Sequence, residues 1–199
     1  MMRYALLLVL FIAGCSSPPP RTIPVSYSTP AMLLTSLKGA ADRSMNEYYA
    51  RLRTATDCEA LPNICRLLAA REIAAEEMSF FFHTMKDRYG SAGARAAQQM
   101  IAGAFDDQYD ALQYASVNAG SGEIAFLRIG EDIYTLRESV VGWRIVQTPT
   151  LKHDPVVTAE AIELLAARVE SVRVGIAAGK YTSIDQVLGA MERVFTPGG

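Results

Sequence analysis

The 199-residue sequence contains few of the residues that most often carry chemistry: two histidines, three cysteines and one tryptophan, with a formal net charge of −2. His83 and His153 lie far apart in the chain. A structural zinc site usually takes four ligands, so we expect neither a metal site nor a cofactor. A nucleic-acid-binding domain shows a basic face or stripe, so the near-neutral charge argues against a nucleic-acid partner. The chain also lacks the Gly-x-Gly-x-x-Gly pattern of a dinucleotide-binding loop.

The apolar run near the start is too short to cross a membrane. Residues 4–13 are all apolar and follow a single basic residue, Arg3. A membrane-spanning helix needs about 20 apolar residues to cross the hydrocarbon core. A basic start followed by a short apolar segment is typical of a secretory signal.

The residues that end this run, Ile12-Ala13-Gly14-Cys15, resemble the lipobox of bacterial lipoproteins. The resemblance covers residues 1–17. It implies that residues 1–14 are a signal peptide and that Cys15 is the lipidation site, whose acyl chains bind membrane lipid. Two other interpretations stay open: an ordinary secretory signal cut at another small residue, and an uncleaved buried helix.

The residue after the cysteine bears on the membrane that is reached. In diderm bacterial lipoproteins, an aspartate at this place resembles an inner-membrane retention signal, and this chain has Ser16. If the organism is diderm, the resemblance therefore implies the periplasmic side of the outer membrane. Residues 15–29 then form the lipid anchor and a proline-rich tether, because closely spaced prolines cannot continue a helix or a central strand.

Helical periodicity begins directly after the tether. Thr29-Pro30 is a helix-start signal, and apolar residues then recur every three or four positions to Leu52, which predicts one helix of about six turns. A second helix is predicted over 64–89, with Gly90 as its C-terminal cap. A short third helix is expected over 91–101.

Two cysteines with six residues between them separate the first two predicted helices. In an exported protein, an oxidising compartment favours a disulfide between Cys58 and Cys65. A loop of this length would add about 2.5 kcal/mol in the chain-entropy model. The alternative is a pair of free thiols packed as small apolar groups.

The period then changes from helix to strand. Strands are predicted over 112–117, 123–129, 133–138 and 143–148, and the short loops between them demand antiparallel hairpins. Asp154-Pro155 then begins another helix, which is followed by a last helix after Ser183. Because helices and strands are segregated along the chain, the fold class is α+β. We expect long N-terminal helices packed on a curved four-stranded meander, followed by a C-terminal helical hairpin.

This order of elements, with Gly142-Trp143-Arg144-Ile145 in the last hairpin, resembles the nuclear transport factor 2-like fold. That fold is a cone formed by a curved sheet around a long helix, with a pocket inside. The resemblance covers about residues 30–149, and residues 150–199 form a C-terminal extension that departs from the family. Either this extension packs across the sheet, or the fold assignment is wrong and the chain is an α-helical lipoprotein with an inserted hairpin.

Catalytic residues are not singled out by any spacing. Enzymes of this fold place an aspartate base and tyrosine donors inside the cone, so the resemblance implies Asp106, Asp107, Tyr109 and Tyr114 as candidates. The two aspartates are explained more simply as a polar loop, and His83 as a core or boundary residue among aromatic neighbours.

We therefore expect a non-enzymatic, membrane-anchored domain of the bacterial cell envelope that binds an unknown protein or a small apolar ligand. One alternative is a small-molecule enzyme that uses a carboxylate in the cone pocket. The other is a purely structural envelope component.

Overall fold

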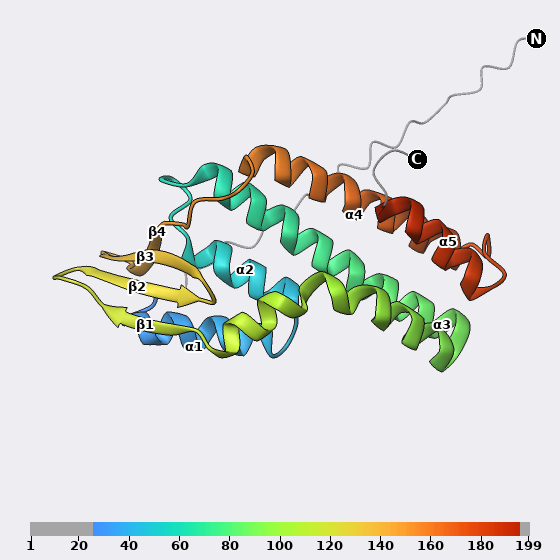
Figure 1. Cartoon of the computed structure of the whole chain (residues 1–199), viewed down its shortest axis with the longest axis horizontal. Coiled ribbons are helices and arrows are strands. Elements are labelled where there is room, and N and C mark those ends of the chain that lie inside the picture. The colour runs from blue at the N-terminus through green and yellow to red at the C-terminus, as the bar shows by residue number, and fades with distance from the viewer. Residues whose placement is uncertain (1–25, 196–199) are drawn as a thin grey trace, which may run out of the picture.

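The computed structural model describes residues 26–195, without the side chains of residues 102–109. Cys15, and with it the lipobox, lies outside the described residues. The fold is α+β, and the predicted order of helices, antiparallel sheet and C-terminal helical hairpin is confirmed (Figure 1). The helices of this range are α1 (Pro30–Ala41), α2 (Met45–Ala55), α3 (Pro62–Gln113), α4 (Pro155–Ala177) and α5 (Ile184–Phe195). The strands are β1 (Ser116–Ala119), β2 (Ile124–Ile129), β3 (Asp132–Ser139) and β4 (Gly142–Gln147).

The first predicted helix is divided in two. Thr29 caps α1 as expected, since its Oγ1 accepts a hydrogen bond from Met32 N at 3.2 Å. The chain then breaks at residues 42–44, and Ser44 Oγ accepts from Glu47 N to cap α2. A serine hydroxyl offers the backbone an alternative to the helical hydrogen bond, so the prediction of one continuous helix was wrong at this point.

Helix α3 is a hairpin of two arms that meet at Gly90, whose φ of 63° and ψ of −148° interrupt the helix. The predicted break is confirmed, and Figure 1 shows the second arm running back beside the first. A Cβ on Gly93 would overlap the carbonyl oxygen of Met85, so the arms approach closely at this glycine. The second arm continues to Gln113 and is longer than predicted. Residues 106 and 107 are therefore helical and do not form the expected loop.

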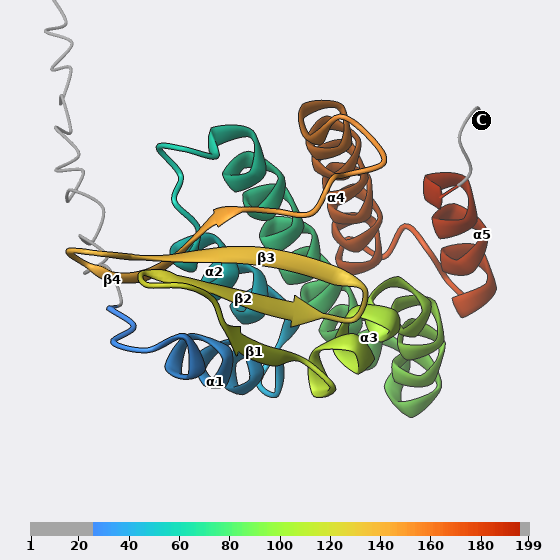
Figure 2. The same ribbon diagram turned by 60° about the vertical axis from the view of Figure 1, so that its left-hand side comes forward.

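The sheet is a meander in the order β1-β2-β3-β4, with all neighbours antiparallel. On its inner face, Leu127, Leu136 and Ile145 are fully buried. Figure 2 shows the sheet in front of α2 and the first arm of α3, so the helices cover one face. On the other face Phe126 and Ile133 are 40% and 44% exposed.

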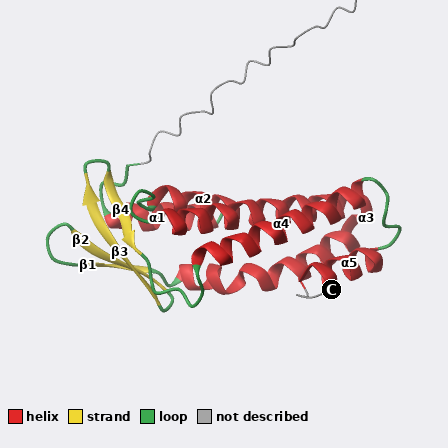
Figure 3. Ribbon diagram, turned by 90° about the horizontal axis from the view of Figure 1, so that it is seen from above, coloured by secondary structure: helices red, strands yellow, loops and turns green. Residues whose placement is uncertain are grey.

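The described part of the chain has two main hydrophobic cores. The sheet-end core joins α1, α2, the two ends of α3 and the sheet, and its buried members include Tyr27, Leu33, Leu37, Tyr48, Tyr49, Leu52, Leu68, Leu112, Leu127, Leu136, Trp143 and Ile145. The helical core joins both arms of α3 with α4 and α5 around Met78, Phe81, Met85, Ala97, Val169, Val172, Ile176, Val187, Ala190 and Met191. Figure 3 shows the sheet at one end and the helices extending from it.

The C-terminal extension packs along α3 rather than across the sheet. Two groups of ion pairs accompany this packing. Arg66 of α3 pairs with Glu163 of α4 at 3.1 Å, and Arg173 of α4 pairs with Glu77 of α3 at 3.0 Å. Within residues 26–195, no helix is long and apolar enough to cross a bilayer.

Candidate functional site

A cavity of about 120 Å³ lies at the sheet end, between α2, the first turns of α3, the start of β3 and the segment after β4. Positions 64, 67, 68 and 71 of α3 share one helical face, so this face presents three apolar side chains and then an arginine. The apolar lining residues are Leu52, Ile64, Leu67, Leu68, Pro149 and Leu151, and the polar ones are Thr56, Arg71, Asp132, Tyr134 and Thr148.

A group of tyrosines surrounds Arg71 beside this cavity. The centre of the Arg71 guanidinium lies 5.8 Å from the ring centre of Tyr49, which is the geometry of a cation–π contact. The rings of Tyr48 and Tyr49 are 5.2 Å apart between centres and tilted by 56°. Strand alternation places Asp132 and Tyr134 together on the inner face of β3. We call these five residues the tyrosine–arginine cluster.

Burial raises the pKa values of the three tyrosines of the cluster further above neutrality. It raises the pKa of Tyr134 to about 12, with a further increase from the Asp132 carboxylate and an opposing effect of Arg71. Burial is also the main cause of the raised pKa values of Tyr48 and Tyr49, and Arg71 again opposes it. At neutral pH all three side chains are therefore neutral phenols that donate or accept hydrogen bonds.

The rim of the cavity is fixed by covalent and backbone links. Cys58 and Cys65 form a disulfide with a Cα–Cα distance of 5.6 Å, so this prediction is confirmed. Asp57 N donates to the Ile145 carbonyl at 2.9 Å, and Thr56 pairs with Ile145 in a parallel bridge. The connection between α2 and α3 is thus tied to β4 and to α3 beside the cavity.

The other residues considered from the sequence do not converge on this cavity. His83 is exposed on α3 with its ring against Phe82, so its expected core or boundary position was wrong. His153 is exposed in the loop before α4. Tyr114 is 86% exposed at the end of α3 and cannot act as a donor inside a cone. The side chains of Asp106, Asp107 and Tyr109 lie outside the described residues.

Sequence reasoning missed Arg71 and Asp132. For Arg71 a signal was available: the apolar face that includes Ile64, Leu67 and Leu68 continues to position 71, where an arginine interrupts it. For Asp132 no local signal existed, because an aspartate two residues after Gly130, at a short turn, is ordinary turn chemistry.

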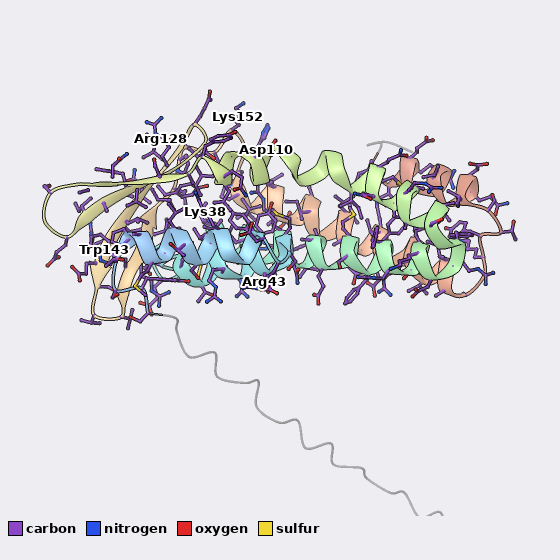
Figure 4. All side chains as sticks on the ribbon, turned by 90° about the horizontal axis from the view of Figure 1, so that it is seen from below. Lys38, Arg43, Asp110, Arg128, Trp143 and Lys152 are labelled. Carbon is purple, nitrogen blue, oxygen red and sulfur yellow. A yellow bond between two sulfur atoms is a disulfide. The ribbon has the colours of Figure 1, made fainter. Side chains whose placement is uncertain are left out.

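At the opposite edge of the sheet-end region, Lys38 of α1 donates from Nζ to the Gln113 carbonyl at 3.0 Å and ties α1 to the end of α3 (Figure 4).

Comparison of the chain with protein-family models, with curated proteins and with solved structures finds no match. Among the described residues, no three histidine, cysteine, aspartate or glutamate side chains are grouped closely enough to hold a metal ion.

Proposed function

We propose that this protein is a membrane-anchored lipoprotein of the bacterial cell envelope whose domain binds a small amphipathic ligand with an anionic group, without catalysing a reaction on it. The position of Arg71 is the observation that indicates this class of ligand. Arg71 lies at an apolar cavity and forms no ion pair with any carboxylate among the described residues. A partly buried guanidinium favours an anionic partner that accepts its hydrogen bonds.

The remaining lining supports an amphipathic ligand of limited size. Six of the lining residues are apolar, and ligand sites combine such walls with a few convergent polar groups. At about 120 Å³ the cavity is smaller than the ~150 Å³ that can hold benzene, so we expect it to take a short acyl chain or part of an aromatic ring. Tyr134 supplies a neutral hydroxyl, and Asp132 at the rim favours a ligand that also carries a hydrogen-bond donor.

The chemistry of the cluster supports binding over catalysis. A general base works best when its pKa lies near the working pH. The tyrosines have pKa values raised away from neutrality, so they are poor bases. Thr56 Oγ1 donates to the Leu52 carbonyl at 2.8 Å and is not aimed at a base.

Binding is tested with benzoate and hexanoate as probes, by NMR titration of the full chain. We expect weak, saturable binding that the Arg71→Met variant lowers at least tenfold, because removal of a charged hydrogen-bond partner costs about 1.5–3 kcal/mol. Arg95→Met is the matched control, since Arg95 is exposed on the second arm of α3. Equal binding by the wild type and Arg71→Met would contradict the proposed site.

The anchor is tested separately through Cys15. We expect the Cys15→Ala chain to keep its N-terminal signal, to carry no acyl chain and to be lost from the membrane fraction. The wild-type N-terminal peptide should carry acyl mass on Cys15. An unmodified N-terminal cysteine peptide in membrane-fractionated wild type would contradict the lipoprotein proposal and leave the ligand proposal untouched.

A further inference from the structure

The β3–β4 hairpin ends in a two-residue turn whose residues, Val140 and Val141, are both apolar and exposed. Val140 is fully exposed and Val141 is 42% exposed. Ser139 Oγ closes the turn, because it accepts from Val141 N at 3.3 Å and donates to the Gly142 carbonyl at 2.7 Å. The positive φ that this hairpin needs is taken by Gly142, at 95°, so Val140 and Val141 keep ordinary backbone conformations. The hydrogen bonds that close the turn use none of their side-chain atoms, and we call the two residues the valine tip.

The chain enters the fold beside the valine tip. Trp143 N donates to the Tyr27 carbonyl at 2.8 Å. A Cβ on Gly142 would lie 2.6 Å from that same carbonyl oxygen, so the two segments are in close contact. Ser26, the first described residue, therefore lies next to the tip. The segment from Cys15 to Ser26 can span at most about 40 Å, which keeps the tip close to any membrane that holds Cys15.

The uncovered face of the sheet continues from the tip and segregates its charges. The burial pattern of β2 points Phe126 and Arg128 outward, and Arg128 lies at the surface in Figure 4. Arg137 of β3 also faces outward, directly opposite Arg144 of β4. The acidic residues of the described strands, Asp132 and Glu138, have the same parity as the buried Leu136 and so do not point to this face, although both are exposed near the ends of β3. We call Phe126, Arg128, Ile133 and Arg137 the outer sheet face.

The position of Arg137 directly opposite Arg144 has an energetic consequence. Like charges directly opposite each other across two strands destabilise a sheet. Arg144 is drawn aside to the Thr54 carbonyl, to which its guanidinium donates. Neither Arg128 nor Arg137 has an ion-pair partner among the described residues. Asp57 and Glu59 line a hollow with Arg137 and the valine tip, but neither pairs with Arg128 or Arg137. Both guanidinium groups are therefore open to an anionic surface.

We propose that the valine tip and the outer sheet face dock on an anionic phospholipid bilayer, so that the anchored domain lies against the membrane instead of hanging free on its tether. The proposal rests on the proposed lipid anchor, which brings the tip to the bilayer. Apolar side chains that insert at the headgroup level and basic residues that attract anionic lipid are the usual parts of such a surface.

The test uses one fluorescent label at a time on the full chain in vesicles. With Cys58 and Cys65 bonded, Val140→Cys provides a thiol for an environment-sensitive dye. The matched control is Ser91→Cys, which is exposed at the corner of α3 at the other end of the molecule (Figure 1). Mass spectrometry of the N-terminal peptide shows in each sample whether Cys15 carries acyl chains.

We expect the Val140 label to shift to the blue and brighten severalfold in vesicles of phosphatidylethanolamine and phosphatidylglycerol, and the Ser91 label to stay water-like. Vesicles of phosphatidylcholine alone, or the Arg128→Gln/Arg137→Gln variant, should lose most of this change. An acylated chain whose Val140 label stays water-like would overturn the docking surface and keep the anchor. In a chain without acyl mass the free Cys15 thiol would also take the dye, so that sample is repeated as Cys15→Ser/Val140→Cys. Absence of acyl mass on the wild-type Cys15, with a label at position 140 that still shifts on anionic vesicles, would overturn the anchor and keep the surface.

Discussion

The two ends of the molecule differ in what their cores are made of. The sheet-end core contains three buried tyrosines and borders Arg71, the disulfide and the cavity. The helical core has methionine, valine, alanine, isoleucine and Phe81 as its buried members. At the border of the helical core, the charge of Arg173 is paired with that of Glu77 at 3.0 Å. Of the two cores, the sheet-end core therefore contains and borders more polar groups.

Under the proposed function, stability and ligand binding depend on different ends of the molecule. The helical core has the composition of a packing unit, whose side chains are satisfied by contact with one another. The sheet-end core accepts polar groups that cost free energy to bury, and functional sites are where folds accept such costs. If this division is correct, changes in the helical core should alter stability alone, whereas changes at the sheet end should also alter binding.

The largest effect is expected from Phe81→Ala in the helical core. Phe81 is fully buried, and its truncation should lower the free energy of unfolding by about 3–5 kcal/mol. Chemical denaturation followed by circular dichroism measures this loss. The dissociation constant for benzoate should not change while the protein is folded, and a weakening of tenfold would break the proposed division.

Removal of the disulfide should have the next largest effect, and at the sheet end. The Cys58→Ser/Cys65→Ser variant should lose about 2.5 kcal/mol of unfolding free energy. Because the disulfide fixes the cavity rim, benzoate binding should also weaken severalfold. Denaturation and NMR titration measure the two effects, and loss of stability with unchanged binding would show that the rim does not need this link.

Alkaline pH should destabilise the fold through the tyrosines. In the unfolded chain they release protons near pH 10, whereas the folded pKa of Tyr134 is about 12. The folded state therefore binds more protons in this interval, and stability falls as pH rises, by about 1.4 kcal/mol per pH unit for each such tyrosine.

Tyr134→Phe removes one of these groups, so its unfolding free energy should fall less steeply between pH 10 and about pH 12. Tyr114→Phe is the control for the loss of a tyrosine hydroxyl, because Tyr114 is 86% exposed and lies outside both cores. The slope comes from denaturation curves at stepped pH. Identical slopes for both variants would refute the assignment of Tyr134 to a buried site.

The smallest expected effects are changes in stability of opposite sign at two tyrosines. The Tyr27 hydroxyl is buried without a hydrogen-bond partner among the described residues, and an unsatisfied group costs about 1–3 kcal/mol. Tyr27→Phe should therefore stabilise the protein by about 1 kcal/mol. Tyr89 Oη donates to the Tyr181 carbonyl at 2.9 Å, so Tyr89→Phe at the helical end should destabilise it by a similar amount. Thermal unfolding of both variants measures this, and a shared sign would contradict the account.

Much of the architecture was predictable because its signals are local. Asp154-Pro155 predicted the start of α4, and Asp154 Oδ1 does accept from Val156 N at 2.7 Å. Gly90 predicted the break in α3, because a positive φ costs glycine little. The turn glycines predicted the meander. The break at Ser44 was missed because the apolar period continues through it and gives no sign of the change of direction.

The candidate site was not predictable as a whole, because it is assembled from four separate segments. Arg71 and Tyr134 are far apart in the chain and meet only when the sheet packs against α2 and α3. The position of α4 along α3 was also beyond local signals, since several apolar residues of α4 face solvent, among them Val157 and Leu164. The resemblance to the nuclear transport factor 2-like fold stays a prediction.

The most direct test of the central claim is an NMR map of the backbone amide shifts that benzoate causes in the wild-type chain. The account predicts saturable shifts confined to the end of α2, residues 64–71 of α3, residues 132–134 of β3 and residues 148–151, with none at the α3 corner. Shifts centred on the helical core, or no saturable shifts at all, would contradict it.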